Sequence, residues 1–251
     1  MKIAMIGSGN VATVMGRLIV QHGHQVVQVI SRDAGHAEIL ASEFGAAYAD
    51  FNGQPDNTAD LFIIAISDTA LESFFVQGGL QDKIIVHTAG SVSKDILTSF
   101  SKRYGVLYPL QSLRKEMTII PPIPFLVDGS DDEVTKFIEN FARSISSSVK
   151  VVGDEERLKL HAAAVVVSNF TNHLYAITED FCDKENLSFN MLKPLILETA
   201  HRIAHVSPSK VQTGPAIRKD IHTLDKHLRL FTAHPKMRTT YLRLTDSIMN
   251  P

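Results

Sequence analysis

The chain has 251 residues, of which 44% are hydrophobic and 21% charged, with a formal net charge of -2. This composition is typical of a globular protein with one large or two modest domains, and the near-neutral charge argues against a general nucleic-acid-binding surface. No apolar run is long enough to span a membrane, and the single cysteine, Cys182, excludes an internal disulfide framework. The sequence therefore predicts a cytoplasmic protein.

The first dozen residues contain a dinucleotide-binding pattern. An apolar run over 2–6 is typical of a buried strand, and Gly7, Gly9 and Ala12 follow it in the order G-x-G-x-x-A, where a helical pattern begins. Gly7 allows a tight turn, Gly9 lets the backbone approach a pyrophosphate, and Ala12 lets the helix pack closely on the sheet. The helix N-terminus would face the phosphates. The sequence predicts a Rossmann unit whose cofactor contacts include Gly7, Ser8, Gly9, Asn10 and Val11.

The end of the second predicted strand, 25–30, indicates which dinucleotide binds. An NAD site has an acidic residue about 20 residues beyond the glycines, where it binds the ribose 2′-hydroxyl. This chain has Ser31 and Arg32 there, with Asp33 one position later. A hydroxyl beside a guanidinium suits a 2′-phosphate, so NADP is favoured over NAD. The alternative is an exposed arginine in a loop.

Strands and helices alternate up to residue 153. We expect helices over 34–44 and 131–145, and strands over 46–49, 61–66, 83–87, 105–108, 125–128 and 149–152. Residues that follow parallel strands lie at the sheet edge where ligands bind. Ile66 and Ser67 follow one strand, and Ala89 and Gly90 follow another, so we predict that all four contact the cofactor. Ser67 is also a candidate helix cap.

Two further residues near this edge are candidates for binding substrate. His87 ends a strand, and Ser91 lies in the small-residue loop that follows it. His87 is either a polar group beside the site or a core histidine whose hydrogen bonds are satisfied within the protein. Both alternatives remain open from the sequence.

The pattern becomes helical after Gly153. We predict a Rossmann domain over 1–153 and a helical domain over 154–251, with helices over 154–181, 192–205, 220–231 and 235–248. The first of these helices is apolar nearly all round and needs burial on several sides. This favours a homodimer formed through the C-terminal helices.

One face of the 154–181 helix is polar. His161, Asn169 and Asn172 recur with Val165 and Ser168 at three- and four-residue spacing, so they share a face. Buried polar groups cost free energy unless they are hydrogen-bonded, and a face that lines a cleft avoids that cost. We predict that His161 donates a proton and that the two asparagines orient a carbonyl, carboxylate or imine. The alternative is that they hold helices together or face a dimer partner.

A second polar cluster follows Thr213-Gly214-Pro215. Arg218 and Lys219 come next, at a predicted helix start, and Arg218 is a candidate clamp for a substrate carboxylate. Turn chemistry explains the glycine and proline equally well. No His, Cys, Asp and Glu spacing indicates a metal site.

Four segments resemble a bacterial family: 7–12, 108–112, 160–169 and 213–218. Its members join a Rossmann-like N-terminal domain to a helical C-terminal domain of unassigned function and are described as NADP oxidoreductases. The first domain is also similar to those of pyrroline-5-carboxylate reductase, the deazaflavin-dependent NADP oxidoreductases and the 6-phosphogluconate dehydrogenase group. In the β-hydroxyacid dehydrogenase branch of that last group, the first interdomain helix carries a catalytic lysine and a following asparagine. This chain has Asn169 but no matching lysine, so the resemblance implies NADP more firmly than it implies that mechanism.

The leading hypothesis is an NADP-dependent oxidoreductase that transfers hydride between NADP(H) and a C=O or C=N group of a small anionic metabolite. The alternative is an NADP-binding sensor or scaffold without turnover, since fold alone does not fix function.

Overall fold

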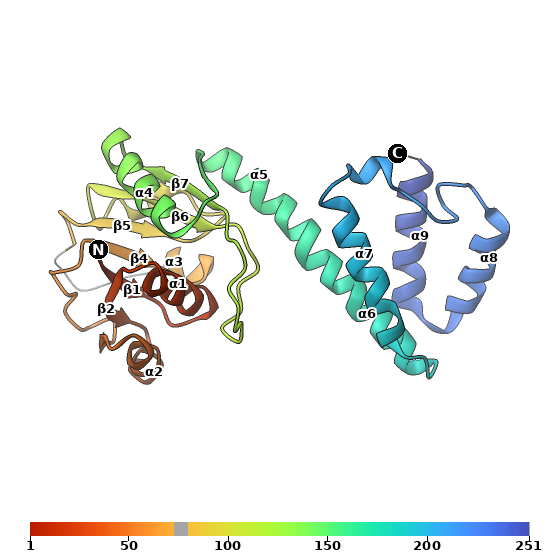
Figure 1. Cartoon of the computed structure of the whole chain (residues 1–251), viewed down its shortest axis with the longest axis horizontal. Coiled ribbons are helices and arrows are strands. Elements are labelled where there is room, and N and C mark those ends of the chain that lie inside the picture. The colour runs from red at the N-terminus through yellow and green to blue at the C-terminus, as the bar shows by residue number, and fades with distance from the viewer. Residues whose placement is uncertain (73–79, 251) are drawn as a thin grey trace. The chain divides into compact units, whose positions relative to one another are not determined.

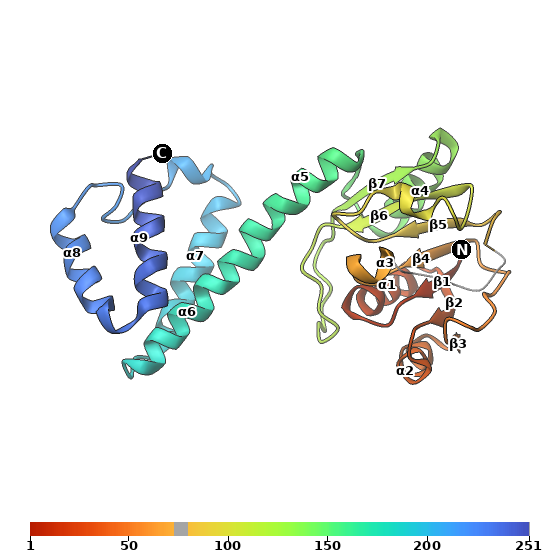
Figure 2. The same cartoon turned by 180° about the vertical axis from the view of Figure 1, so that it is seen from behind.

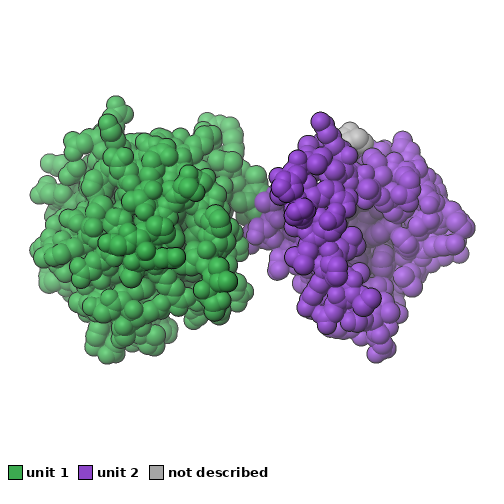
Figure 3. Space-filling view, in the orientation of Figure 1, with its two compact units in different colours: residues 1–166 green, residues 167–251 purple. Residues whose placement is uncertain are grey.

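The computed structural model describes residues 1–72 and 80–250. The chain forms two compact units, Met1–Val166 and Val167–Pro251, which Figure 3 distinguishes by colour. The first unit is an α/β domain and the second is helical. Within the described residues no helix is both long enough and apolar enough to cross a membrane.

The first unit is built on one eight-stranded sheet, in the order β3-β2-β1-β4-β5-β6-β7-β8. Its strands are β1 (Lys2–Ile6), β2 (Gln25–Ile30), β3 (Ala47–Ala49), β4 (Leu61–Ile64), β5 (Ile84–His87), β6 (Arg103–Pro109), β7 (Phe125–Gly129) and β8 (Val149–Val151). The chain runs outward from β1 to β3 and then returns to the other side of β1. The predicted Rossmann fold is confirmed, and its switch point lies between β1 and β4, where such sheets bind ligands.

The last two strands, β7 and β8, run against the other six and so depart from the predicted parallel sheet. β7 pairs antiparallel with β6, whereas the other neighbouring strands pair in parallel. The connection over 110–124 contains no helix, and a parallel return would need a crossover that carries the chain back along the sheet. The sheet is therefore mostly, not wholly, parallel.

Helices cover both faces of the sheet (Figure 1). α1 (Asn10–Gln21), α2 (Ala34–Phe44) and α4 (Asp132–Ile145) pack their apolar residues on one face. The other face packs against α3 (Asp68–Glu72) and the 3-10 turn Lys94–Leu97. Strands β1, β4 and β5 are buried from both sides, which explains their unbroken apolar runs.

The predicted helix over 154–181 is interrupted. It consists of α5 (Asp154–Ala164), a π-helical segment (Val165–Phe170) and α6 (Thr171–Lys184). The prediction that this stretch is buried is wrong for the single chain, since Val167 is 72% exposed and Phe170 58%. α5 lies in the first compact unit although the predicted second domain begins at Asp154.

The second unit contains α6, α7 (Lys193–Ile203), α8 (Ile221–Leu230) and α9 (Pro235–Met249) (Figure 2). α9 packs against both α6 and α8. The Phe181 ring lies edge-on to Phe231 and His234, with centroids 5.2 and 4.9 Å away. These aromatic contacts hold α6 to the start of α9.

Candidate functional site

A cavity of about 600 Å³ lies where β1, β2 and β4 end. Its lining includes seven of the predicted cofactor residues: Gly7, Ser8, Gly9, Ser31, Arg32, Ile66 and Ser67. Segments separated by up to sixty positions in the sequence meet here because the carboxyl ends of parallel strands share one edge of the sheet.

The glycine loop fits a pyrophosphate. Gly7 has a φ of +119°, and a Cβ there would lie 2.2 Å from the Ala65 carbonyl oxygen, so the turn requires glycine. A Cβ on Gly9 would meet nothing within 4 Å, which leaves the space beside that backbone open. Gly9 also caps α1 without a side-chain acceptor, so the first N–H groups of the helix remain for an anion.

The other end of the cavity fits a 2′-phosphate. Ser31 is buried, and its hydroxyl is 2.8 Å from the hydroxyl of Ser8, while Arg32 is exposed on the cavity lining. The Asp33 carboxylate accepts the His36 amide N–H at 3.0 Å and caps α2. That hydrogen bond is the main cause that lowers the pKa of Asp33. Asp33, the acidic residue closest in sequence to the expected ribose contact, thus serves as the N-cap of α2.

Several lining residues were not predicted as cofactor contacts, among them the polar His36 and Asn52. His36 lies in the first turn of α2, four positions after Arg32. This spacing is the sequence feature that could have indicated that the two side chains lie close together. Asn52 lies in the loop after β3, which no motif marks.

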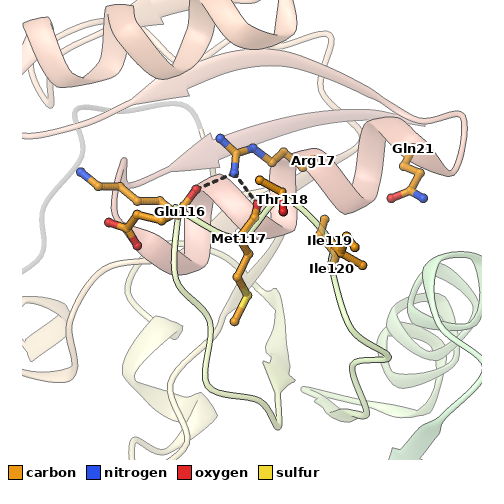
Figure 4. Close-up of a pocket in the computed structure, with 8 residues that line it drawn as sticks. Arg17, Gln21, Glu116, Met117, Thr118, Ile119 and Ile120 are labelled. Atoms are coloured by element: carbon orange, nitrogen blue, oxygen red, sulfur yellow. Dashed lines mark hydrogen bonds between the residues drawn. The ribbon is translucent and has the colours of Figure 1, made fainter. Parts of the chain in front are cut away.

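Asn10 and Val11 are not among the residues lining this cavity. The side-chain oxygen of Asn10 accepts the Lys115 amide N–H at 3.1 Å, and Arg17 donates to the Lys115 carbonyl at 2.6 Å. Figure 4 shows Arg17 reaching this loop from α1, beside a separate pocket of about 640 Å³. The side chain of Asn10 therefore anchors the 110–124 connection.

His87 corresponds to the core-histidine alternative. It is fully buried at the end of β5, where Nδ1 accepts the Ala89 N–H at 3.1 Å and Nε2 donates to the Ser93 carbonyl at 3.3 Å. Burial is the main cause that lowers its pKa to about 4, and the charge of Arg157 adds to the effect. Both ring nitrogens are used within the protein, so His87 shapes the loop that contains Ala89 and Gly90.

The candidates beside that loop have their own partners. Ser91 is exposed, and its hydroxyl donates to the Asp68 carboxylate at the start of α3. Ser67 accepts the Ala70 N–H at 3.3 Å, so it caps α3 and lines the cofactor cavity as well.

His161 lies against the same loop. Its Nδ1 is 2.8 Å from the hydroxyl of Tyr108, and the two rings meet edge-on. A Cβ on Gly90 would lie 2.6 Å from Nδ1 of His161 and 2.9 Å from Cζ of Tyr108. The pair therefore packs directly on the backbone of Gly90, at the ligand-binding edge of the sheet.

Tyr108 received no role from the sequence, although it begins one of the quoted family motifs. It lies near the end of β6 and is 9% exposed. This position near the end of a strand is the sequence feature that could have marked Tyr108 as a candidate site residue. The hydrogen bond to α5 could not be predicted, because it joins positions 53 residues apart.

The last predicted residues lie in the second unit. Asn169, Asn172 and Arg218 are all exposed there. The predicted face shared with His161 assumed a continuous α-helix, and the π-helical turns between Val165 and Phe170 change that spacing. Arg218 lies in a turn just before α8, which begins within one residue of the predicted helix start at Asp220.

Comparison with known proteins gives two family matches. Residues 2–91 match "NADP oxidoreductase coenzyme F420-dependent", and residues 123–248 match "Domain of unknown function (DUF2520)". No curated protein matches the chain.

Three solved structures are similar over most of the chain. A Bacteroides fragilis protein assigned as an NADP oxidoreductase is 35% identical, with a TM-score of 0.91 over 100% of this chain and 98% of that one. A 1-pyrroline-5-carboxylate reductase of Streptococcus pyogenes is 14% identical, with a TM-score of 0.64 over 100% and 99%. A reductive aminase of Aspergillus terreus, solved with NADPH and ethyl-5-oxohexanoate, is 17% identical, with a TM-score of 0.64 over 100% and 90%.

The last two similarities show the fold alone, whereas the first extends to sequence over the whole chain. With the two family matches, it shows that the chain belongs to the NADP oxidoreductase family and carries a DUF2520 domain over residues 123–248.

Proposed function

We propose that the protein transfers hydride between NADP(H) and a C=O or C=N group of a small anionic metabolite. The observation that carries this proposal is the Tyr108–His161 pair on Gly90, in the same compact unit as the dinucleotide cavity. Bound NADPH supplies the hydride. The chain must supply a proton to the oxygen or nitrogen of the reduced group, and histidine is suited to this near neutral pH.

The remaining candidate residues have distinct roles in the proposal. Gly7, Ser8 and Gly9 hold the pyrophosphate, while Ser31 and Arg32 hold the 2′-phosphate. Asn10 and Val11 contribute through the start of α1, and Ile66, Ser67, Ala89 and Gly90 contact the cofactor from the ends of β4 and β5. Ser91, in the same unit as the cavity, supplies a polar group for the substrate.

A homodimer is part of the proposal. The second unit exposes many large apolar side chains, among them Val167, Phe170, Met191, Leu195 and Leu197. An exposed apolar surface of this extent marks a contact with another chain, and most homo-oligomers are symmetric dimers. We propose that the C-terminal helices form this contact.

The test is turnover of NADPH with a panel of keto acids and cyclic imines, using the wild-type protein and His161→Asn. We expect one substrate class to be reduced, with turnover at least about a hundredfold lower in the variant because its proton donor is lost. The affinity for NADPH, measured by titration, should be unchanged. His201→Asn, at an exposed histidine of α7, is the matched control.

Two results would contradict the proposal. Equal turnover in wild type and His161→Asn would exclude His161 as the donor. Tight NADPH binding with no reduction of any panel member would favour the alternative, an NADP-binding sensor.

A further inference from the structure

Three residues of α5 fasten this helix to the loop after β5. Asp154, Arg157 and His161 recur at three- and four-residue spacing, so they lie on one face. The Asp154 carboxylate accepts the Lys94 N–H at 3.4 Å, and Arg157 donates to the Val92 carbonyl. His161 lies one turn further along, on Gly90. These contacts between α5 and the loop therefore hold the His161 ring in place on Gly90.

The hydrogen bond between Tyr108 and His161 can run in either direction, because the donor depends on the tautomer of the histidine ring. Burial is the main cause that raises the pKa of Tyr108, and the charge of Asp68 raises it further, so the hydroxyl keeps its proton at neutral pH. Among the described residues, the Tyr108 hydroxyl has Nδ1 of His161 as its hydrogen-bond partner. The relay proposed below uses the arrangement in which the hydroxyl donates and Nδ1 accepts. The single proton of the neutral ring is then on Nε2.

We propose that Tyr108 and His161 form a proton relay to the substrate, an inference that rests on the proposed function. As NADPH delivers hydride to carbon, the Nε2–H bond of His161 breaks and the proton bonds to the oxygen or nitrogen of the substrate. The O–H bond of Tyr108 breaks at the same time, and its proton bonds to Nδ1. The products are the reduced substrate, NADP, a neutral His161 with its proton on Nδ1, and a tyrosinate. The relay is restored when a solvent proton bonds to Nε2 and the Nδ1 proton returns to the tyrosinate oxygen.

Arg157 is the counter-charge that this relay needs. Its side chain is 1% exposed and bridges the Val92 carbonyl and Asp154, the latter at 2.8 Å. Its Nε and Nη1 atoms are buried and have no hydrogen-bond partner among the described residues. Its charge acts on Tyr108 and lowers its pKa, opposing burial and Asp68. A buried cation of this kind stabilises a transient tyrosinate more than the neutral phenol.

The relay predicts how the rate depends on pH. A single histidine donor must be an imidazolium, whose population falls as the pH rises. A relay starts from the neutral ring and does not have this limit. The turnover rate of the wild type should therefore fall less steeply with rising pH than that of Tyr108→Phe.

The experiment has two readouts on wild type, Tyr108→Phe and His161→Asn. The first is nitrogen NMR of the histidine rings in protein without ligand, with His161→Asn to assign the signal. We expect the neutral His161 ring in wild type to carry its proton on Nε2, and Tyr108→Phe to become a mixture of both tautomers. A wild-type ring protonated on Nδ1 would overturn the relay, whether or not a substrate is known.

The second readout is the pH profile of turnover, with NADPH affinity and thermal unfolding as controls for folding of Tyr108→Phe. A profile identical to wild type would refute the relay while leaving His161 as donor. If His161→Asn keeps full turnover, the donor assignment in the proposed function fails instead, so the two failures are distinguishable.

Discussion

Arg32 is the residue through which the choice of cofactor can be tested. It lines the cavity beside Ser31, and a charge-assisted bond to phosphate contributes about 1.5–3 kcal/mol. We predict that Arg32→Ala weakens NADPH binding by about 10–100-fold and leaves NADH binding within about twofold. Titration with both nucleotides measures this. Arg114→Ala, at an exposed arginine paired with Glu116, is the control, and equal losses for both nucleotides would exclude the 2′-phosphate role.

His87 makes stability depend on pH. Its pKa is about 4 in the folded protein, against about 6.5 for an ordinary histidine, so the unfolded chain binds the proton more tightly. The contribution of the neutral His87 ring to the free energy of unfolding is complete above about pH 6.5. As the pH falls towards 4, the free energy of unfolding decreases by about 3 kcal/mol in all. Denaturant unfolding at several pH values, compared with His87→Asn, measures this contribution. The variant keeps a donor and an acceptor but cannot be protonated, so parallel curves for the two proteins would contradict the prediction.

The positions of single residues could be predicted from the sequence where they depend on neighbouring residues in the chain. The glycine loop and Ser31-Arg32 could be placed at one edge of the sheet, where they line the same cavity, because a strand end determines where the next residues lie. His87 stayed ambiguous, since its two partners depend on how the following loop folds back. Tyr108 was missed because the hydrogen bond that gives it a role comes from α5, far along the sequence.

At the scale of elements, the strands and most helices could be predicted because their apolar residues repeat with the right period. α2 was predicted with its observed ends, since Asp33 caps it and Gly45 ends it with a φ of +63°. The π-helical segment could not be predicted. Its residues are apolar on several sides, so a change in helical spacing leaves no mark in the hydrophobic pattern.

The antiparallel β7 shows a second limit. An apolar run predicts a buried strand but not its direction, which depends on the connection before it. The prolines of the 110–124 connection indicated that no helix returns the chain across the sheet. From that observation, the direction of β7 could have been predicted.

At the scale of the whole molecule, the exposed apolar helices predict the oligomeric state. We expect sedimentation to give twice the mass of one chain, and Leu197→Glu on α7 to shift the protein towards monomer, because Leu197 is 70% exposed. Ile39→Glu is the matched control, since Ile39 is 72% exposed on α2 in the other unit. A wild-type protein that sediments as a monomer at all concentrations would rule out the proposed dimer.

The capping role of Asp33 constrains how this protein could be engineered to use NAD. An existing carboxylate beside the ribose would ordinarily be the simplest starting point, but here it holds the first turn of α2. Turning it towards a 2′-hydroxyl would give up this helix cap. A designer should therefore introduce a new acid at Ser31 or Arg32 and leave Asp33 in place. Libraries that vary all three positions together would lose many members to helix destabilisation before cofactor preference is ever selected.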